Sequence, residues 1–168
     1  SEIIRMFNSS FNGLTGNDND YYPEDKRSVI DQLNDKIYSA VNNGVYRTGF
    51  AKTQEAYDEA VSALFKMLDE LDDILAKNKY LTGDEITEAD LRLIPTLLRF
   101  DIVYVTHFKC NCKRIKDYEH LGRYARELYE IPAIKETTNL EHIKRHYYYS
   151  HESINPYRII PKGPDVLF

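Results

Sequence analysis

The chain has 168 residues, of which 29% are charged and 42% hydrophobic, a balance that excludes wholesale disorder and an integral membrane protein. Its formal net charge of −5 argues against a general nucleic-acid-binding protein, so we expect neither a nucleic acid nor a membrane as partner. The two cysteines, Cys110 and Cys112, are too few for a disulfide scaffold and favour a reducing, cytoplasmic compartment.

Two segments of the N-terminal half have the periodicity of amphipathic helices. The first helix is predicted over residues 24–43 and ends at an Asn-Gly pair, a common C-terminal signal. The second follows Thr53, a good N-cap, and reaches about Lys77. Residues 12–20 are rich in Asn, Asp and Gly, which predicts a loop.

The most apolar segment predicts a central helix over about residues 88–106. It is preceded by Thr87 and contains Asp90, and each of these side chains can accept a hydrogen bond from the backbone N–H of the other residue. Apolar residues occur on almost every side of this helix. Such a helix is typical of the centre of a bundle.

The C-terminal third predicts shorter helices and an irregular end. The helices are expected at about 118–130, 132–137 and 139–149. Three prolines follow within residues 150–168 and predict an extended tail. No segment shows the alternation of a β-strand. We therefore predict an all-α fold over residues 1–168, a single domain in which six or seven helices surround the helix at 88–106.

Two groups of side chains could in principle hold a metal ion. Cys110 and Cys112 are separated by one residue, but zinc prefers four ligands and no second cysteine pair exists. His142 and His146 lie four residues apart, with His151 nearby, but basic residues separate them and the metalloprotease pattern is missing. We therefore expect no metal.

The aromatic composition is unusual, with 14 tyrosines, seven phenylalanines and no tryptophan. A tyrosine combines an apolar ring with a hydroxyl that needs a partner once it is buried. The tyrosines either line a polar aromatic cavity or lie at the boundary of the core, and boundary positions suffice for most of them. Residue types alone thus indicate a helical domain without a readable function.

Short motifs are distributed over the whole chain. They are Glu2-Ile-Ile-Arg-Met-Phe-Asn8, Val41-Asn-Asn-Gly-Val-Tyr-Arg47, Thr87-Glu-Ala-Asp90, Arg99-Phe-Asp101, Val103-Tyr104, His107-Phe-Lys-Cys-Asn111, His142-Ile-Lys-Arg-His-Tyr-Tyr148, Ser150-His151 and Ile154-Asn-Pro156. Together these motifs resemble the C-terminal helical domain of the glutathionyl-hydroquinone reductases, the Xi class of glutathione transferases, which is similar to the Omega class. The resemblance implies a glutathione transferase C-terminal-like bundle.

The resemblance also implies a reaction. It indicates a reductase that removes glutathione from glutathionyl-hydroquinones, with glutathione as co-substrate and with hydroquinone and glutathione disulfide as products. In this family a thioredoxin-like domain supplies the nucleophilic cysteine, and the helical domain lines the hydroquinone pocket. Tyr46 matches the tyrosine that exchanges a proton with the departing hydroquinone. Tyr104 and Tyr147 match tyrosines that lower the pKa of the cysteine, because hydroxyl donors favour a thiolate.

The chain starts at Ser1 and contains no thioredoxin-like segment, so we expect that domain to be absent here. We then expect no glutathione-binding residue in this chain and no turnover by the chain alone. The implied partners are the glutathione conjugate, the thioredoxin-like domain of the same protein and a second copy in a homodimer. Two alternatives stay open: a non-catalytic, transferase-like interaction scaffold, and an Omega-type thiol transferase that reduces dehydroascorbate.

Overall fold

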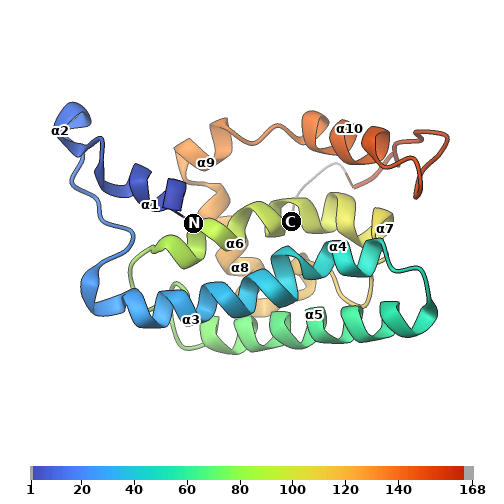
Figure 1. Cartoon of the computed structure of the whole chain (residues 1–168), viewed down its shortest axis with the longest axis horizontal. Helices are drawn as coiled ribbons and strands as arrows, with labels where there is room; N and C mark the ends of the chain where they lie inside the picture. Colours follow the sequence, from blue (N-terminus) through green and yellow to red (C-terminus); the bar gives the residue numbers. More distant parts are fainter. Residues whose placement is uncertain (1, 165–168) are drawn as a thin grey trace.

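The computed structural model describes residues 2–164, which form helices joined by loops (Figure 1). The α-helices are α1 (Glu2–Ser9), α2 (Asn12–Thr15), α3 (Arg27–Ile37), α4 (Gly44–Gly49), α5 (Gln54–Leu75), α6 (Glu88–Arg99), α7 (Val105–His107), α8 (Glu119–Tyr129), α9 (Pro132–Glu136) and α10 (Leu140–Ser150). Short segments of 3₁₀ or π type are η1 (Glu24–Lys26), η2 (Tyr38–Asn42), η3 (Phe100–Tyr104) and η4 (Ile115–Asp117). No strand occurs among the described residues, and the all-α prediction is confirmed.

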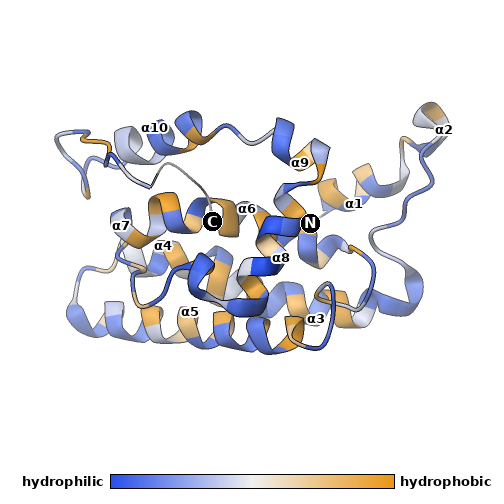
Figure 2. Cartoon of the chain, turned by 180° about the vertical axis from the view of Figure 1, so that it is seen from behind, coloured by the Kyte–Doolittle hydropathy of each residue, from blue (hydrophilic) through white to orange (hydrophobic). Residues whose placement is uncertain are grey.

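The helix predicted at the centre of the bundle is found there. α6, η3 and α7 follow one another without a break from Glu88 to His107, and every residue of the π-helical segment η3 is buried. α3, α4 and α5 lie on one side of this rod and α9 and α10 on the other (Figure 1). In Figure 2 the long helix α5 alternates apolar and polar patches, as an amphipathic surface helix does. Among the helices of residues 2–164, none combines the length and hydropathy that a membrane span requires.

The first helix ends at the Asn43-Gly44 pair, as predicted: η2 ends at Asn42, and α4 begins at Gly44. The Asn43 carbonyl starts α4 by accepting hydrogen bonds from the backbone N–H groups of Tyr46 (3.1 Å) and Arg47 (3.0 Å). Gly44 does not adopt the left-handed conformation that often accompanies a helix end. A Cβ at Gly44 would lie 3.9 Å from Leu64 of α5, an ordinary contact distance, so the packing of α4 on α5 does not require glycine here.

The segment predicted as a loop, residues 12–20, also contains one helical turn, α2. Gly16 ends this turn in the left-handed region at φ 67°, and its N–H donates to the Asn12 carbonyl at 2.8 Å. The three helices predicted for the C-terminal third are observed as α8, α9 and α10, and each end lies within one residue of its predicted position. The irregular tail predicted for 150–168 is observed from residue 151 to 164, and residues 165–168 lie outside the described part of the chain.

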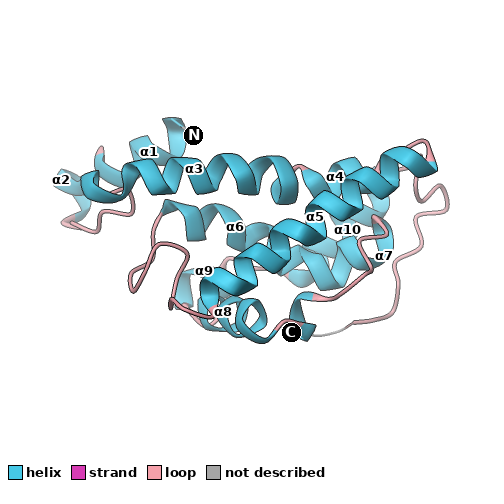
Figure 3. Ribbon diagram, turned by 90° about the horizontal axis from the view of Figure 1, so that it is seen from below, coloured by secondary structure: helices cyan, strands magenta, loops and turns pink. Residues whose placement is uncertain are grey.

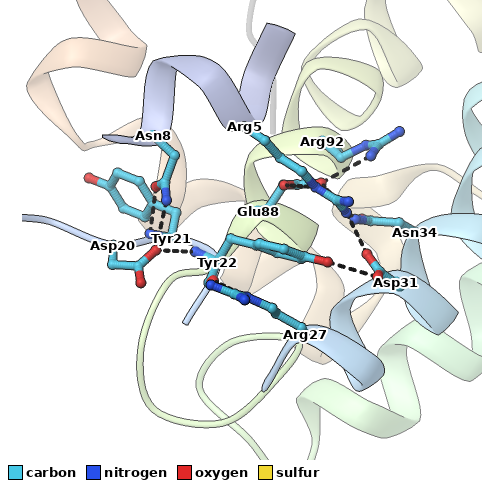
Figure 4. A network of polar contacts seen from close by, with 10 residues as sticks. All are labelled: Arg5, Asn8, Asp20, Tyr21, Tyr22, Arg27, Asp31, Asn34, Glu88 and Arg92. Carbon is cyan, nitrogen blue, oxygen red and sulfur yellow. Dashed lines mark hydrogen bonds and ion pairs between the residues drawn. The ribbon is translucent and has the colours of Figure 1, made fainter. Parts of the chain in front are cut away.

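None of the residues of α1 is buried, so this helix contributes no side chain to the core. Polar contacts attach it to the bundle. Arg5 donates from Nε to Oε2 of Glu88 at 3.1 Å and also pairs with Asp31 of α3. Asn34 and Arg92 each donate to Oε1 of the Glu88 carboxylate at 3.0 Å (Figure 4). The Glu88 side chain is only 3% exposed, so this network neutralises a buried charge and holds α1 against the start of α6.

Glu88→Gln is expected to release α1 and to lower the free energy of unfolding by about 2 kcal/mol, because two arginines lose their acceptor charge. NMR relaxation of the α1 amides should report faster motion, and urea denaturation should report the loss of stability. Glu85→Gln, at an exposed position three residues earlier, is the matched control. Equal stability and equal α1 mobility in the two variants would contradict the role of this network.

Candidate functional site

The structure brings the three predicted tyrosines together. Tyr46 lies on α4, Tyr104 ends η3 and Tyr147 lies on α10, at the end of the bundle where α4, α7 and α10 meet (Figures 1 and 3). The hydroxyl oxygen of Tyr147 is 2.7 Å from that of Tyr46 and 2.7 Å from that of Tyr104. We call this hydrogen-bonded series, Tyr104–Tyr147–Tyr46, the phenol chain.

Each tyrosine is positioned by its own helix. Tyr46 lies in the short helix α4. In the same helix, the hydroxyl of Thr48 donates a hydrogen bond to the carbonyl of Gly44 at 2.9 Å. Tyr104 belongs to the wholly buried π-helical segment of the central rod, and such segments are frequent at functional sites. The helix of Tyr147, α10, is capped by Asn139. The side chain of Asn139 accepts a hydrogen bond from the backbone N–H of His142 at 3.0 Å.

Burial decreases along the phenol chain. Tyr104 is 2% exposed, Tyr147 4% and Tyr46 36%. The buried Phe108 stacks on Tyr104 with ring centroids 5.4 Å apart, and the Tyr46 ring lies 5.2 Å from the same phenylalanine. The phenol chain therefore begins in the core and ends at the surface.

The two inner phenols stay protonated. Burial raises the pKa of Tyr147 to about 12. Burial and the adjacent Tyr147 raise the pKa of Tyr104 further still. Neither group ionises near neutral pH, so both act as hydroxyl donors and not as phenolates.

The hydrogen bonds of the phenol chain have a favoured direction. Three hydroxyls share two hydrogen bonds, which leaves one proton for an acceptor outside the series. If Tyr104 donates to Tyr147 and Tyr147 to Tyr46, this proton belongs to the exposed hydroxyl. The opposite direction leaves the buried proton of Tyr104 without an acceptor among the described residues, and donation from both outer tyrosines to Tyr147 does the same to the buried proton of Tyr147. Either arrangement costs about 1–3 kcal/mol. Tyr46 is therefore an outward-facing donor, suited to an anion or a carbon that takes up a proton.

Gly49, the last residue of α4, leaves the space that Phe108 occupies. A Cβ at this position would lie 2.2 Å from Cδ1 of Phe108 and 2.3 Å from its Cγ. Gly49→Ala is therefore expected to lower the free energy of unfolding by about 2–3 kcal/mol and to displace the ring on which two of the tyrosines pack. Chemical denaturation measures the effect. Gly13→Ala, whose Cβ would meet no atom within 4 Å, is the control, and a loss no larger at Gly49 than there would contradict the packing argument.

Neither cysteine has the features of a nucleophile at the phenol chain. Both are free thiols. Cys110 is buried, and burial raises the pKa of its thiol to about 12, so the thiolate is scarce near neutral pH. Cys112 is exposed and lies outside the tyrosine cluster's hydrogen bonds. Within residues 2–164, no three His, Cys, Asp or Glu side chains are grouped in a way that could hold a metal ion.

Sequence reasoning missed the groups that surround the phenol chain. Nε2 of His107 is 3.0 Å from Nδ1 of His151, and the His151 ring lies 5.7 Å from that of Phe108 and 5.1 Å from that of Phe50. The sequence indicated His151 as a possible zinc ligand and as part of a family motif, and the structure makes it a hydrogen-bond partner of a buried imidazole. No spacing rule pairs two histidines 44 residues apart.

The chain is similar in sequence to glutathione transferases. Residues 54–127 match the family described as glutathione S-transferase, C-terminal domain. The chain is 54% identical to glutathionyl-hydroquinone reductase YqjG of Escherichia coli K12 over 98% of this chain and 50% of the relative. It is 49% identical to glutathione S-transferase omega-like 2 of Schizosaccharomyces pombe over 98% of this chain and 55% of that protein. The chain thus spans about half the length of the curated relatives it matches.

Solved structures share the fold. The glutathione-bound structure of YqjG from Escherichia coli K-12 has a TM-score of 0.96 at 54% identity, covering 99% of this chain and 54% of that one. Glutathione-S-transferase Xi from Phanerochaete chrysosporium also has a TM-score of 0.96 at 54% identity, covering 99% of this chain and 58% of that one. Residues 54–127 thus match the C-terminal domain family of the glutathione S-transferases, and the described residues have the fold that these solved transferases show over the matched half.

Proposed function

We propose that this domain forms the hydroquinone side of the pocket in a glutathione-dependent reductase that removes glutathione from glutathionyl-hydroquinones. The observation that carries the proposal is the phenol chain, which places a hydroxyl donor at the surface and supports it with two buried phenols. The similarity to the protein named glutathionyl-hydroquinone reductase supports the same activity. Because the reaction uses free glutathione, we place the protein in the reducing cytoplasm.

The proposed reaction is a thiol–disulfide exchange with a proton transfer to carbon. A cysteine thiolate of the thioredoxin-like half attacks the sulfur of the conjugate, and a new S–S bond forms as the ring C–S bond breaks. The electron pair of the broken bond stays on the ring carbon, which takes a proton. The thiolate of a second glutathione then attacks the glutathione sulfur of the mixed disulfide between cysteine and glutathione, so that glutathione disulfide forms and the cysteine leaves as a thiolate. The ring carbon is reduced, and the two glutathione sulfurs are oxidised.

The tyrosines have distinct proposed roles. Tyr46 donates the proton to the departing ring, since its hydroxyl is at the exposed end of the phenol chain. Tyr104 and Tyr147 favour the thiolate of the cysteine. Their own hydroxyls are engaged within the phenol chain, so they act by polarising the outward hydroxyl, which then stabilises a nearby anion. Tyr46 regains its proton from solvent after the second glutathione has reacted.

The thioredoxin-like half is proposed to cover α1. Ile3 and Phe7 on this helix are 69% and 64% exposed, and a cavity of about 580 Å³ with apolar walls from Phe7, Phe11 and Leu91 lies beside it. Exposed apolar surface of this kind marks an interaction site. The remaining proposed partners are the hydroquinone conjugate, glutathione as co-substrate and a second copy of the protein.

The test compares substrates in a protein that carries a thioredoxin-like domain in front of this one. We expect turnover of glutathionyl-hydroquinones at a kcat/KM well above that for dehydroascorbate, and no turnover by the 168-residue chain alone. Preference for dehydroascorbate would indicate an Omega-type transferase instead. Absence of turnover on both substrates would leave the interaction scaffold as the function.

A further inference from the structure

A histidine pair joins the helical segments that carry Tyr104 and Tyr147. His107 ends α7, which follows η3 directly, and His151 follows the last residue of α10. Their ring nitrogens are 3.0 Å apart, and His107 is only 4% exposed. The hydrogen bond therefore ties the end of α10 to the central rod about one turn beyond Tyr104.

α10 has few other anchors. Its buried residues are Ile143, Tyr147 and Tyr148, and the rest of the helix is exposed or half-buried. Tyr147 precedes His151 by four residues, so the two side chains lie on the same side of the helix end. A displacement of His151 would consequently displace the tyrosine that bridges the phenol chain.

The same aromatic rings contact the histidine pair and the phenol chain. The ring centroid of His151 lies 5.7 Å from that of Phe108 and 5.7 Å from that of Tyr147. The His107 ring lies 5.1 Å from Phe108, on which Tyr104 stacks. The histidine pair and the phenol chain thus form one packed cluster. We therefore expect a displacement of either histidine ring to displace the tyrosine hydroxyls.

We propose that the hydrogen bond between His107 and His151 holds Tyr147 at the centre of the phenol chain. Both histidines are positioning residues, since they act through the tyrosine and not on the substrate. The consequence for catalysis rests on the proposed function, whereas the placement of Tyr147 does not.

The hydrogen bond depends on protonation. A doubly protonated pair has no acceptor nitrogen and brings two positive charges together, so at least one ring must be neutral. Burial lowers the pKa of His107 to about 4, and burial followed by the nearby His146 lowers that of His151. The titratable groups that face the pair are His146, Tyr147, Tyr148 and Lys109. The bond is therefore intact while either ring is neutral, as near neutral pH, and it is lost in acid once both rings carry a proton, for which the pH must fall through the His107 pKa of about 4.

NMR of the 168-residue chain with labelled tyrosine rings tests the placement without any turnover. His151→Ala is expected to shift the ring signals of Tyr147, whereas His142→Ala, at an exposed position of the same helix, leaves them unchanged. His151→Asn keeps a side-chain donor and acceptor and should restore the wild-type signals. Unchanged Tyr147 signals in His151→Ala would overturn the proposal.

A pH titration covers the case in which His151→Ala does not fold. The Tyr147 signals of the wild-type chain should move as the pH falls through about 4 and should move less in His151→Asn, because a protonated His107 can still donate to the asparagine oxygen. Identical titrations in the two proteins would overturn the proposal.

Turnover supplies the second readout, in a protein that also carries the thioredoxin-like half. His151→Ala is expected to lower kcat roughly tenfold with KM for glutathione changed less than about twofold, since a misplaced donor affects the chemical step. His151→Asn should retain the activity and lose less of it in acid. A protein without any reductase turnover refutes the proposed function, while the NMR result decides the placement independently.

Discussion

Tyr46→Phe is expected to lower kcat for glutathionyl-hydroquinones about a hundredfold, because the leaving ring loses its positioned proton donor. The tyrosine is 36% exposed, and its hydroxyl makes one hydrogen bond, to Tyr147. The free energy of unfolding should fall by about 1–3 kcal/mol, because the buried hydroxyl of Tyr147 loses its acceptor. Steady-state kinetics of the protein with its thioredoxin-like half and urea denaturation of the same variant measure the two effects.

Tyr147→Phe interrupts the phenol chain at its centre and is expected to lower kcat by a similar factor. Its cost in stability is of the same order, about 1–3 kcal/mol, because the buried hydroxyl of Tyr104 loses its partner. Tyr149→Phe is the matched control, since this tyrosine lies on the same helix but is 42% exposed. Wild-type rates in both Tyr46→Phe and Tyr147→Phe would refute the roles assigned to the phenol chain.

Asp90→Ala is expected to cause the largest loss of stability, about 4 kcal/mol. The fully buried carboxylate accepts hydrogen bonds from the backbone N–H groups of Leu81 (3.0 Å) and Thr87 (2.8 Å). It also accepts from the hydroxyls of Thr87 (3.1 Å) and Tyr124 (2.8 Å). The alanine leaves these donors buried without an acceptor and removes the cap of the central helix.

Urea denaturation compares Asp90→Ala with Asp84→Ala, an exposed aspartate in the loop before α6. The control should change the free energy of unfolding by less than about 0.5 kcal/mol. A loss below about 1 kcal/mol for Asp90→Ala would mean that water or a rearranged loop satisfies the donors, contrary to the geometry described above.

Helix starts were predictable because they depend on neighbours in the sequence. Thr53 caps α5 by accepting from the N–H of Ala56 at 3.2 Å, and at α6 the Asp90 carboxylate accepts from the backbone N–H of Thr87 at 2.8 Å. Both signals are satisfied within three residues, so they can be recognised without tertiary contacts. The central position of α6 was predictable as well, since a helix apolar on all sides is stable only inside a bundle.

Helix ends and attachments were less predictable. The Asn43-Gly44 pair ends the first helix as predicted, but Gly44 does not take the left-handed conformation and α4 starts directly at this residue, which no local signal indicated. The contact of Arg5 with Glu88 joins residues 83 positions apart and has no counterpart in the sequence pattern. Such features depend on how the helices pack, so their prediction requires the tertiary structure.

The sequence by itself determined the helical class, the central helix and, through family motifs, the three tyrosines of interest. Only the tertiary structure decided that their hydroxyls are hydrogen-bonded in series, that Tyr46 is the exposed end, and that His107 pairs with His151. The physical reason is the separation along the sequence of the residues that interact. Periodicity and capping act over three or four residues, whereas bonds between residues 43 to 101 positions apart form only where the packing of several helices brings the side chains into contact.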